Sequence, residues 1–159
     1  MNEIALKTNQ DLLNYQALRL QELMNEMVQC CDDRKLYESE RFHAPYAELM
    51  CLMLFNGQRY LTVKDLARKL DVAKSRITKI VDGLVQKGFV ERIEDPKDAR
   101  VKLIGLTPAG KKASREFDAF HKKIHRSILL QISPDERKNA LSHLEMLRSA
   151  MEAVKEQLK

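Results

Sequence analysis

A short segment in the middle of the chain combines cations with hydroxyl groups. Its five polar members are Lys74, Ser75, Arg76, Thr78 and Lys79. The planar fork of an arginine can donate two hydrogen bonds to O6 and N7 of guanine, which discriminates against a wrong base by about 1–3 kcal/mol. We therefore predict that Arg76 contacts a base of double-stranded DNA. Its polar neighbours are suited to phosphates or to mixed roles.

A second polar cluster lies about 20 residues further on and contains Lys97, Asp98 and Arg100. A guanidinium is attracted by the concentrated negative potential of a narrow minor groove. Asp98 is close enough in sequence to orient Arg100 through a charge-assisted hydrogen bond. We expect Lys97 and Arg100 to contact phosphates or the minor groove.

The charge distribution sets these clusters apart from the rest of the chain. Of the 159 residues, the segment 58–102 holds 12 Lys and Arg against 7 Asp and Glu, whereas the remainder holds 16 of each sign. The whole net charge of +5 is thus concentrated in one central segment. A local polyanion-binding surface on a neutral scaffold has this distribution.

Hydrophobic periodicity predicts the elements that must position these residues. A long amphipathic helix runs from Leu12 to about Asp33, and a second begins at Pro45 and is closed by the turn Asn56-Gly57. Two short helices follow, the first capped by Thr62 with Asp65 and the second ending at Gly88. The remaining elements are β-prone segments at 89–93 and 101–106, a helix from Thr107 to about Gln131, and a last helix whose capping box is Ser133 to Glu136.

This order predicts a mainly α fold with a small β-hairpin wing, that is, a winged helix-turn-helix combined with a helical dimerisation region. We expect N-terminal helices at 1–58, a DNA-binding lobe at 59–107 and C-terminal helices at 108–159, together forming one compact domain. The terminal helices have apolar stripes that need a partner, and a second copy of the chain is the simplest one. A homodimer is therefore expected.

Several motifs resemble those of the MarR/SlyA-type transcriptional regulators. The similar segments are Leu66-Ala67, Ser75, Thr78-Lys79, Val81-Asp82, Lys87 to Arg92, Asp98 to Arg100 and Leu106 to Gly110. The resemblance implies a dimer held by the first and last two helices, a pseudopalindromic DNA site, entry of Arg100 into the minor groove, and repression relieved by a small-molecule or redox signal. Gly83 departs from the family, which often has a larger polar residue there.

The resemblance also implies a crevice for an aromatic acid effector, near the first, second and fifth helices. The side chains that we expect to line it are Met24, Tyr46, Met50, Met53, Phe117 and His121. Core packing is the alternative interpretation of the same residues.

Two other signals remain open. No cofactor and no metal site are predicted, but His121 and His125, with Cys51 and His43, form an alternative zinc set. Cys30, Cys31 and Cys51 are expected to be plain thiols. The adjacent pair Cys30 and Cys31 could oxidise or bind a soft metal, but the nearby Asp32 and Asp33 would raise rather than lower the thiol pKa there.

The sequence indicates neither an enzyme nor a membrane protein. It contains no glycine-rich phosphate loop, no activated nucleophile and no paired acidic motif. No apolar run approaches the roughly 20 residues that span a bilayer, and the first residues lack the order of a secretory signal, so a cytoplasmic location is expected. A non-enzymatic protein-interaction adaptor is the alternative of a different class, and the localised positive charge argues against it.

Overall fold

The computed structural model describes residues 2–98 and 100–158, with side chains from Asn9 onward. It is mainly helical with one small antiparallel sheet, which confirms the predicted fold class. The chain divides into two compact units, Met1–Lys111 and Lys112–Lys159. In the described part of the chain, no helix combines the length and apolar character that a membrane span requires.

The first helix, α1 (Asn2–Phe42), is longer at both ends than predicted. The polar stretch after Asp33 continues the helix, and its side chains form pairs at helical spacing, including Lys35 with Asp32 at 2.8 Å and Arg34 with Glu38 at 4.0 Å. The helix ends at Phe42, just before His43, which has a positive φ of 50°, and Pro45. The predicted end at Asp32-Asp33 was wrong because hydrophobic periodicity does not register such polar pairs.

The helix-turn-helix consists of α3 (Val63–Leu70) and α4 (Lys74–Gln86), and α2 (Tyr46–Met53) packs against α4. Thr62 and Asp65 form the predicted capping box, in which the Thr62 Oγ1 accepts from the Asp65 backbone N–H at 3.0 Å. Asp71 closes α3 in the left-handed conformation, with φ 53°. The inner face of α4 is fully buried at Ile77, Val81 and Leu84.

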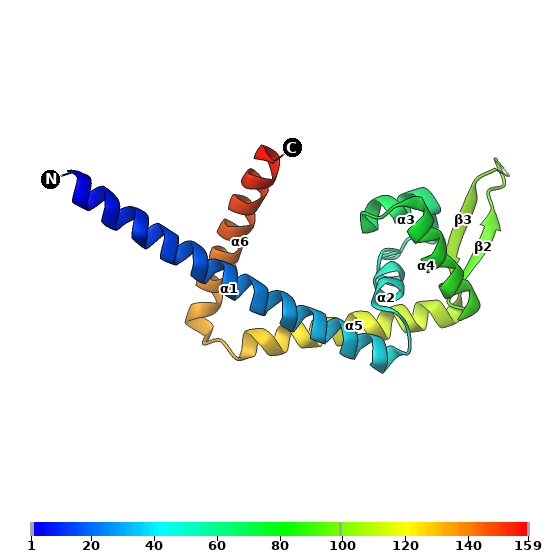
Figure 1. Ribbon diagram of the computed structural model, residues 1–159. Helices are drawn as coiled ribbons and strands as arrows, with labels where there is room; N and C mark the ends of the chain where they lie inside the picture. Colours follow the sequence, from blue (N-terminus) through cyan, green and yellow to red (C-terminus); the bar gives the residue numbers. More distant parts are fainter. Residues whose placement is uncertain (1, 99, 159) are drawn as a thin grey trace. The chain divides into compact units, whose positions relative to one another are not determined.

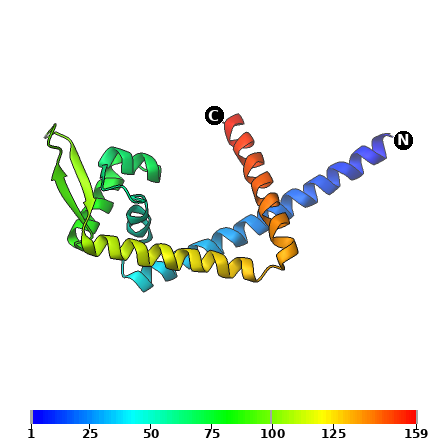
Figure 2. The same cartoon turned by 180° about the vertical axis from the view of Figure 1, so that it is seen from behind.

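The wing contains a strand that the periodicity did not predict. The hairpin of β2 (Val90–Glu94) and β3 (Lys102–Leu106) agrees with the prediction to within a residue or two, and it extends beyond α3 and α4 (Figures 1 and 2). The additional strand, β1 (Tyr60–Thr62), pairs antiparallel with β3, giving the order β1-β3-β2. Three residues are too few to show a period of two in the sequence.

A compact junction joins the end of α4, the base of the hairpin and the start of α5 (Pro108–Leu130). Gly88 takes the predicted left-handed conformation, with φ 70°. The Thr107 hydroxyl donates to the Gly88 carbonyl at 2.6 Å and accepts from the Gly110 N–H at 3.0 Å, while the Thr107 N–H donates to the Phe89 carbonyl at 3.1 Å. Thr107 is therefore the N-cap of α5, and it also joins the two ends of the hairpin by hydrogen bonds.

The second unit contains most of α5 and all of α6 (Pro134–Gln157). Pro134 occupies the first turn of α6 as predicted, but the predicted capping box is absent because the Ser133 side chain makes no cap hydrogen bond. The turn is held by Arg137 instead, whose Nε donates to the carbonyls of Leu129 at 2.8 Å and Ile132 at 3.0 Å. Arg137 thus satisfies carbonyls at the end of α5 that a helix terminus leaves unpaired.

Gly110→Ala is expected to destabilise the winged helix. A Cβ at this position would lie 1.8 Å from the Phe89 carbonyl oxygen and 2.8 Å from its carbonyl carbon, and a backbone held by Thr107 cannot move aside cheaply. We expect a loss of at least about 2 kcal/mol in the free energy of unfolding, measured by urea denaturation. Ala109→Ser at the exposed neighbouring position should leave this free energy unchanged within about 0.5 kcal/mol, and equal losses in the two variants would contradict the junction.

Candidate nucleic-acid interface

The first two turns of α4 carry the polar cluster that the sequence singles out. Its five members, Lys74, Ser75, Arg76, Thr78 and Lys79, are all exposed. The Thr78 hydroxyl donates to the Lys74 carbonyl at 2.8 Å, so it bonds within the helix in the absence of a ligand. Because the opposite side of α4 is buried, the helix is fixed with its N-terminal cations facing solvent.

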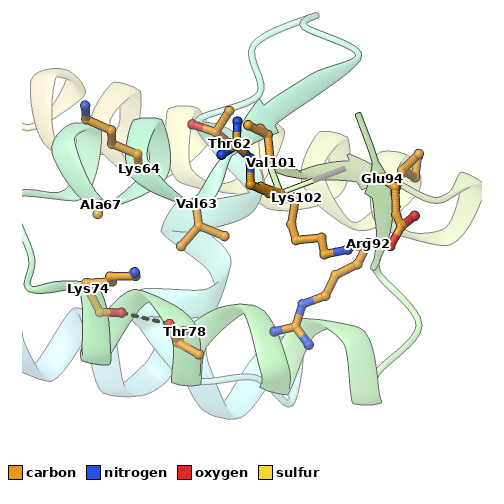
Figure 3. A pocket seen from close by; sticks show the side chains of 12 residues that line it. Thr62, Val63, Lys64, Ala67, Lys74, Thr78, Arg92, Glu94, Val101 and Lys102 are labelled. Atoms are coloured by element: carbon orange, nitrogen blue, oxygen red, sulfur yellow. Dashed lines mark hydrogen bonds and ion pairs between the residues drawn. The ribbon is translucent and has the colours of Figure 1, made fainter. Parts of the chain in front are cut away.

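A cavity of about 860 Å³ lies between the helix-turn-helix and the hairpin, and all of it belongs to the first unit. Five basic residues and one acidic residue contribute to its lining: Lys64, Lys74, Arg92, Arg100, Lys102 and Glu94. Figure 3 shows Arg92 extending from β2 toward α4, where Lys74 and Thr78 lie. The excess of positive charge makes this concave surface suited to a polyanion such as a phosphodiester backbone.

Three of the residues predicted to bind DNA, Lys74, Thr78 and Arg100, are brought together around this cavity. Arg76 and Lys79 are exposed on α4 outside the lining, and Lys97 is exposed at the wing tip. Lys64, Arg92 and Lys102 are lining residues that the sequence reasoning missed. Arg92 could have been found, since Arg92 and Glu94 alternate with Ile93 along β2 and so share one face of the strand.

Ion pairs fix part of this surface. Arg92 pairs with Asp82 of α4, and Lys102 pairs with Glu94 on the adjacent strand. Lys102 donates to the Glu94 carboxylate and holds its pKa below the usual range. The Arg92–Asp82 pair holds the hairpin against α4, and the Lys102–Glu94 pair joins the two strands of the hairpin. Both pairs neutralise cations within the protein. Lys74, Arg76 and Lys79 remain exposed on α4.

The wing tip has the geometry that the sequence predicts for Asp98 and Arg100. The Arg100 Nε donates to the Asp98 Oδ1 at 3.1 Å and its Nη2 donates to the Oδ2 at 3.3 Å. This fork lowers the pKa of Asp98. The Arg100 side chain is nevertheless 90% exposed, so Asp98 orients the guanidinium without covering it.

The residues expected to receive a signal are divided between the two units. Met24, Tyr46, Met50 and Met53 are half-buried in the first unit, and burial raises the pKa of Tyr46. In the second unit the rings of Phe117 and His121 lie 5.4 Å apart, and those of His121 and His125 lie 4.5 Å apart.

The residues of the alternative metal and thiol signals differ in their exposure to solvent. His43 is exposed, whereas Cys51 is fully buried, and burial raises its pKa to about 12. Cys30 and Cys31 are exposed. Within 2–98 and 100–158, no three His, Cys, Asp or Glu side chains are grouped to hold a metal ion.

Comparisons with known proteins agree with this architecture. The model of the MarR family matches residues 45–102, which extend from the start of α2 through the first residue of β3. The chain is 33% identical over 111 residues to YfiV, an HTH-type transcriptional regulator of Bacillus subtilis, and the match covers 69% of each protein. It is 30% identical over 90 residues to the transcriptional regulator AdcR of Streptococcus pneumoniae, covering 55% of this chain and 62% of AdcR.

Solved structures show the same fold. YusO of Bacillus subtilis superposes with a TM-score of 0.71 at 25% identity, covering 86% of this chain and 97% of YusO. FabT of Streptococcus pneumoniae, solved in complex with DNA, superposes with a TM-score of 0.71 at 20% identity, covering 85% of this chain and 99% of FabT. These regulators are not enzymes. From the fold, the family match and the identity to YfiV, the chain belongs to the MarR family of DNA-binding, HTH-type transcriptional regulators.

Proposed function

We propose that this regulator binds a pseudopalindromic DNA site as a homodimer, represses transcription there, and is released by a small-molecule effector. In this proposal the N-terminal turns of α4 enter the major groove, with Arg76 donating to a guanine. Arg100 reaches the minor groove from the wing. Lys74, Ser75, Thr78, Lys79 and Lys97 contact phosphates or have mixed roles.

The observation that carries the DNA-binding mode is the cation-lined cavity between α4 and the hairpin. It gathers Lys74, Arg92 and Arg100 from three segments around one concave surface. A sugar-phosphate backbone seated there would place the exposed turn of α4 beside the base edges of the major groove. The two hydrogen bonds between Asp98 and the Arg100 guanidinium support the proposed role of Arg100, because they restrict the orientation of an exposed side chain.

A dimer is supported by apolar surface that each chain leaves exposed. Among the side chains that the structure describes, the exposed large apolar ones lie on α1, α5, α6 and Leu158, with Val85 the single exception. The 24-residue α6 has no buried residue, although Leu141, Leu144 and Met151 share one face. Helices in proteins owe most of their stability to packing of such a face, and a second chain supplies it.

Affinity for a duplex should fall steeply with salt, because each phosphate contact releases counterions. The probe is a duplex selected by the protein from a random pool, titrated by fluorescence anisotropy at 50 and 200 mM NaCl. With at least six phosphate contacts we expect a loss of about 10³-fold or more over this range.

Arg100→Ala should weaken binding to the same duplex by about 10-fold or more while the dimer persists, since it removes the fork from the wing. Arg115→Ala, an exposed arginine on α5, is the matched control and should change affinity less than twofold. Equal effects of the two substitutions would mean that the wing does not contribute to DNA binding. In the salt titration above, an affinity that does not change with salt would favour a protein-binding adaptor.

The double variant Leu141→Asp/Leu144→Asp is expected to convert the dimer to monomer. Burial of a leucine contributes about 2 kcal/mol, and charges at an apolar interface would add to the loss, so we expect the dissociation constant to rise by more than about 100-fold. Sedimentation equilibrium measures it. His143→Asp places a charge about 200° around the helix from Leu141 and should leave the dimer intact; a dimer in both cases would contradict this interface.

Release by an aromatic acid is the regulatory part of the proposal. Half-buried Tyr46, Met50 and Met53, together with Met24, Phe117 and His121, are the residues proposed to receive it. We expect a hydroxylated benzoic acid to displace the selected duplex from EDTA-treated protein in the anisotropy assay. Displacement by zinc alone would favour the metal alternative with His43, Cys51, His121 and His125. Displacement by peroxide alone would favour a thiol signal.

A further inference from the structure

Gly83, the residue that departs from the family pattern, lies directly against a buried carboxylate. Glu48 of α2 is only 6% exposed. A Cβ built on Gly83 would lie 2.1 Å from the Glu48 Oε1 and 3.0 Å from its Cδ. The Glu48 carboxylate therefore occupies the space of a side chain at position 83, and a methyl group there would force the end of the Glu48 side chain or the α4 turn to shift.

The Glu48 carboxylate also contacts a second residue of α4, the helix that contains Gly83. Lys87, the C-cap of α4, pairs with it through a distance of 2.9 Å between Nζ and Oε2. The Lys87 N–H also donates to the Gly83 carbonyl at 3.1 Å, so both contacts of Glu48 belong to one closed turn. The Glu48 side chain is 8% exposed and that of Lys87 is 32% exposed, so moving the carboxylate away from Gly83 would disturb a pair whose acidic member is buried.

This arrangement is costly for the helix and for the core. Glycine lowers the stability of a helix interior, and the carboxylate lies near the C-terminus of α4, where it opposes the helix dipole. Its position in the first turn of α2 is favourable to that helix and offsets part of this cost. An apolar contact between α2 and α4 would avoid both costs. What the arrangement supplies is a fixed distance and register between α2 and α4, since a charge pair with a close backbone approach tolerates less sliding than apolar side chains do.

The register matters because of what else lies on this side of α4. Arg76 precedes Gly83 by seven residues, which is two turns or about 10.5 Å along the same side of the helix. A shift of the Gly83 turn by about 1 Å, enough to relieve the clash with a methyl group, would tilt the turn that presents Arg76. Base-edge hydrogen bonds are lost over such distances, whereas screened attraction to phosphates is not.

We propose that Glu48, Gly83 and Lys87 form a latch between α2 and α4 that sets the position of the recognition helix for sequence-specific binding. Glu48 and Lys87 are positioning residues, and neither contacts DNA in this scheme. The inference rests on the proposed DNA-binding mode, because it assigns to the latch the discrimination between a specific site and other DNA.

The first test compares two affinities for each variant, both by anisotropy at one salt concentration. One duplex is that selected by the unmodified protein from a random pool, and the other is an unrelated duplex of the same length. We expect Gly83→Ala to weaken binding to the selected duplex by about 10-fold and to the unrelated duplex by less than twofold. Gln86→Ala, at an exposed position of α4, is the control and should change neither.

The second test uses compensation. Glu48→Ala vacates the space next to Gly83, so adding Gly83→Ala to it should raise the thermal unfolding midpoint, because alanine favours the helix. In the presence of Glu48 the same substitution should lower that midpoint. The double variant should also bind the selected duplex at least threefold more tightly than Gly83→Ala alone. The effect of Gly83→Ala on the unfolding midpoint should thus change sign when Glu48 is removed, and this is measurable without DNA. The same sign in both backgrounds would contradict the contact between Glu48 and Gly83, even if Gly83→Ala folds poorly.

Lys87 gives a third variant pair. Lys87→Met should reduce the preference for the selected duplex by several-fold, and Lys87→Arg should retain it. Equal losses for both duplexes would mean that the latch only supports folding and would overturn its positioning role. If the unmodified protein selects no duplex, the proposed DNA-binding mode fails and this role fails with it, whereas selection with an unchanged preference in Gly83→Ala overturns the latch alone.

Discussion

The carbonyl group of Phe89 is the point on which the geometry of the DNA-binding lobe depends. It accepts the Thr107 N–H, and the absence of a Cβ at Gly110 lets α5 begin directly against it. Gly88 turns the chain there by its positive φ, so α4 ends where β2 starts. These contacts involve backbone atoms, which cannot adjust like side chains. The angle between the recognition helix and the wing is therefore fixed by steric exclusion and by hydrogen bonds that hold both ends of the hairpin.

The cations of this lobe fall into two groups, those paired with carboxylates of the protein and those exposed to a ligand. Arg92 pairs with Asp82, and Lys102 pairs with Glu94. These pairs are half-exposed, so each contributes little to stability, but the first joins the hairpin to α4 and the second joins its two strands. The Arg100 side chain is paired yet 90% exposed, because its partner Asp98 lies only two residues earlier and covers little of the guanidinium. The local positive charge of the sequence thus separates into cations that shape the surface and cations that are available to a polyanion.

The terminal helices leave most of their apolar side chains exposed. In α1, among the side chains described from Asn9 onward, the single buried one is that of Glu38, and α6 buries none. Their leucines and methionines are nonetheless spaced as a helix needs in order to bury a face. The lobe around α4 has a core of its own, with Leu66, Ile77 and Ile104 fully buried. A dimer would supply the missing core of the terminal helices without altering that of the lobe.

Local chemistry in the sequence determined the helices, their caps at Thr62 and Thr107, the turn at Gly88 and the hairpin, because caps, turns and periodicity act over a few residues. It also determined the charged cluster on α4 and the pairing of Asp98 with Arg100. The tertiary structure alone decided that β1 joins the sheet, that Lys64, Arg92 and Lys102 complete the cavity, and that Glu48 occupies the space at Gly83. These features join residues as far apart in sequence as Tyr60 and Gly105, and no local rule of spacing specifies which distant residues meet when a chain packs.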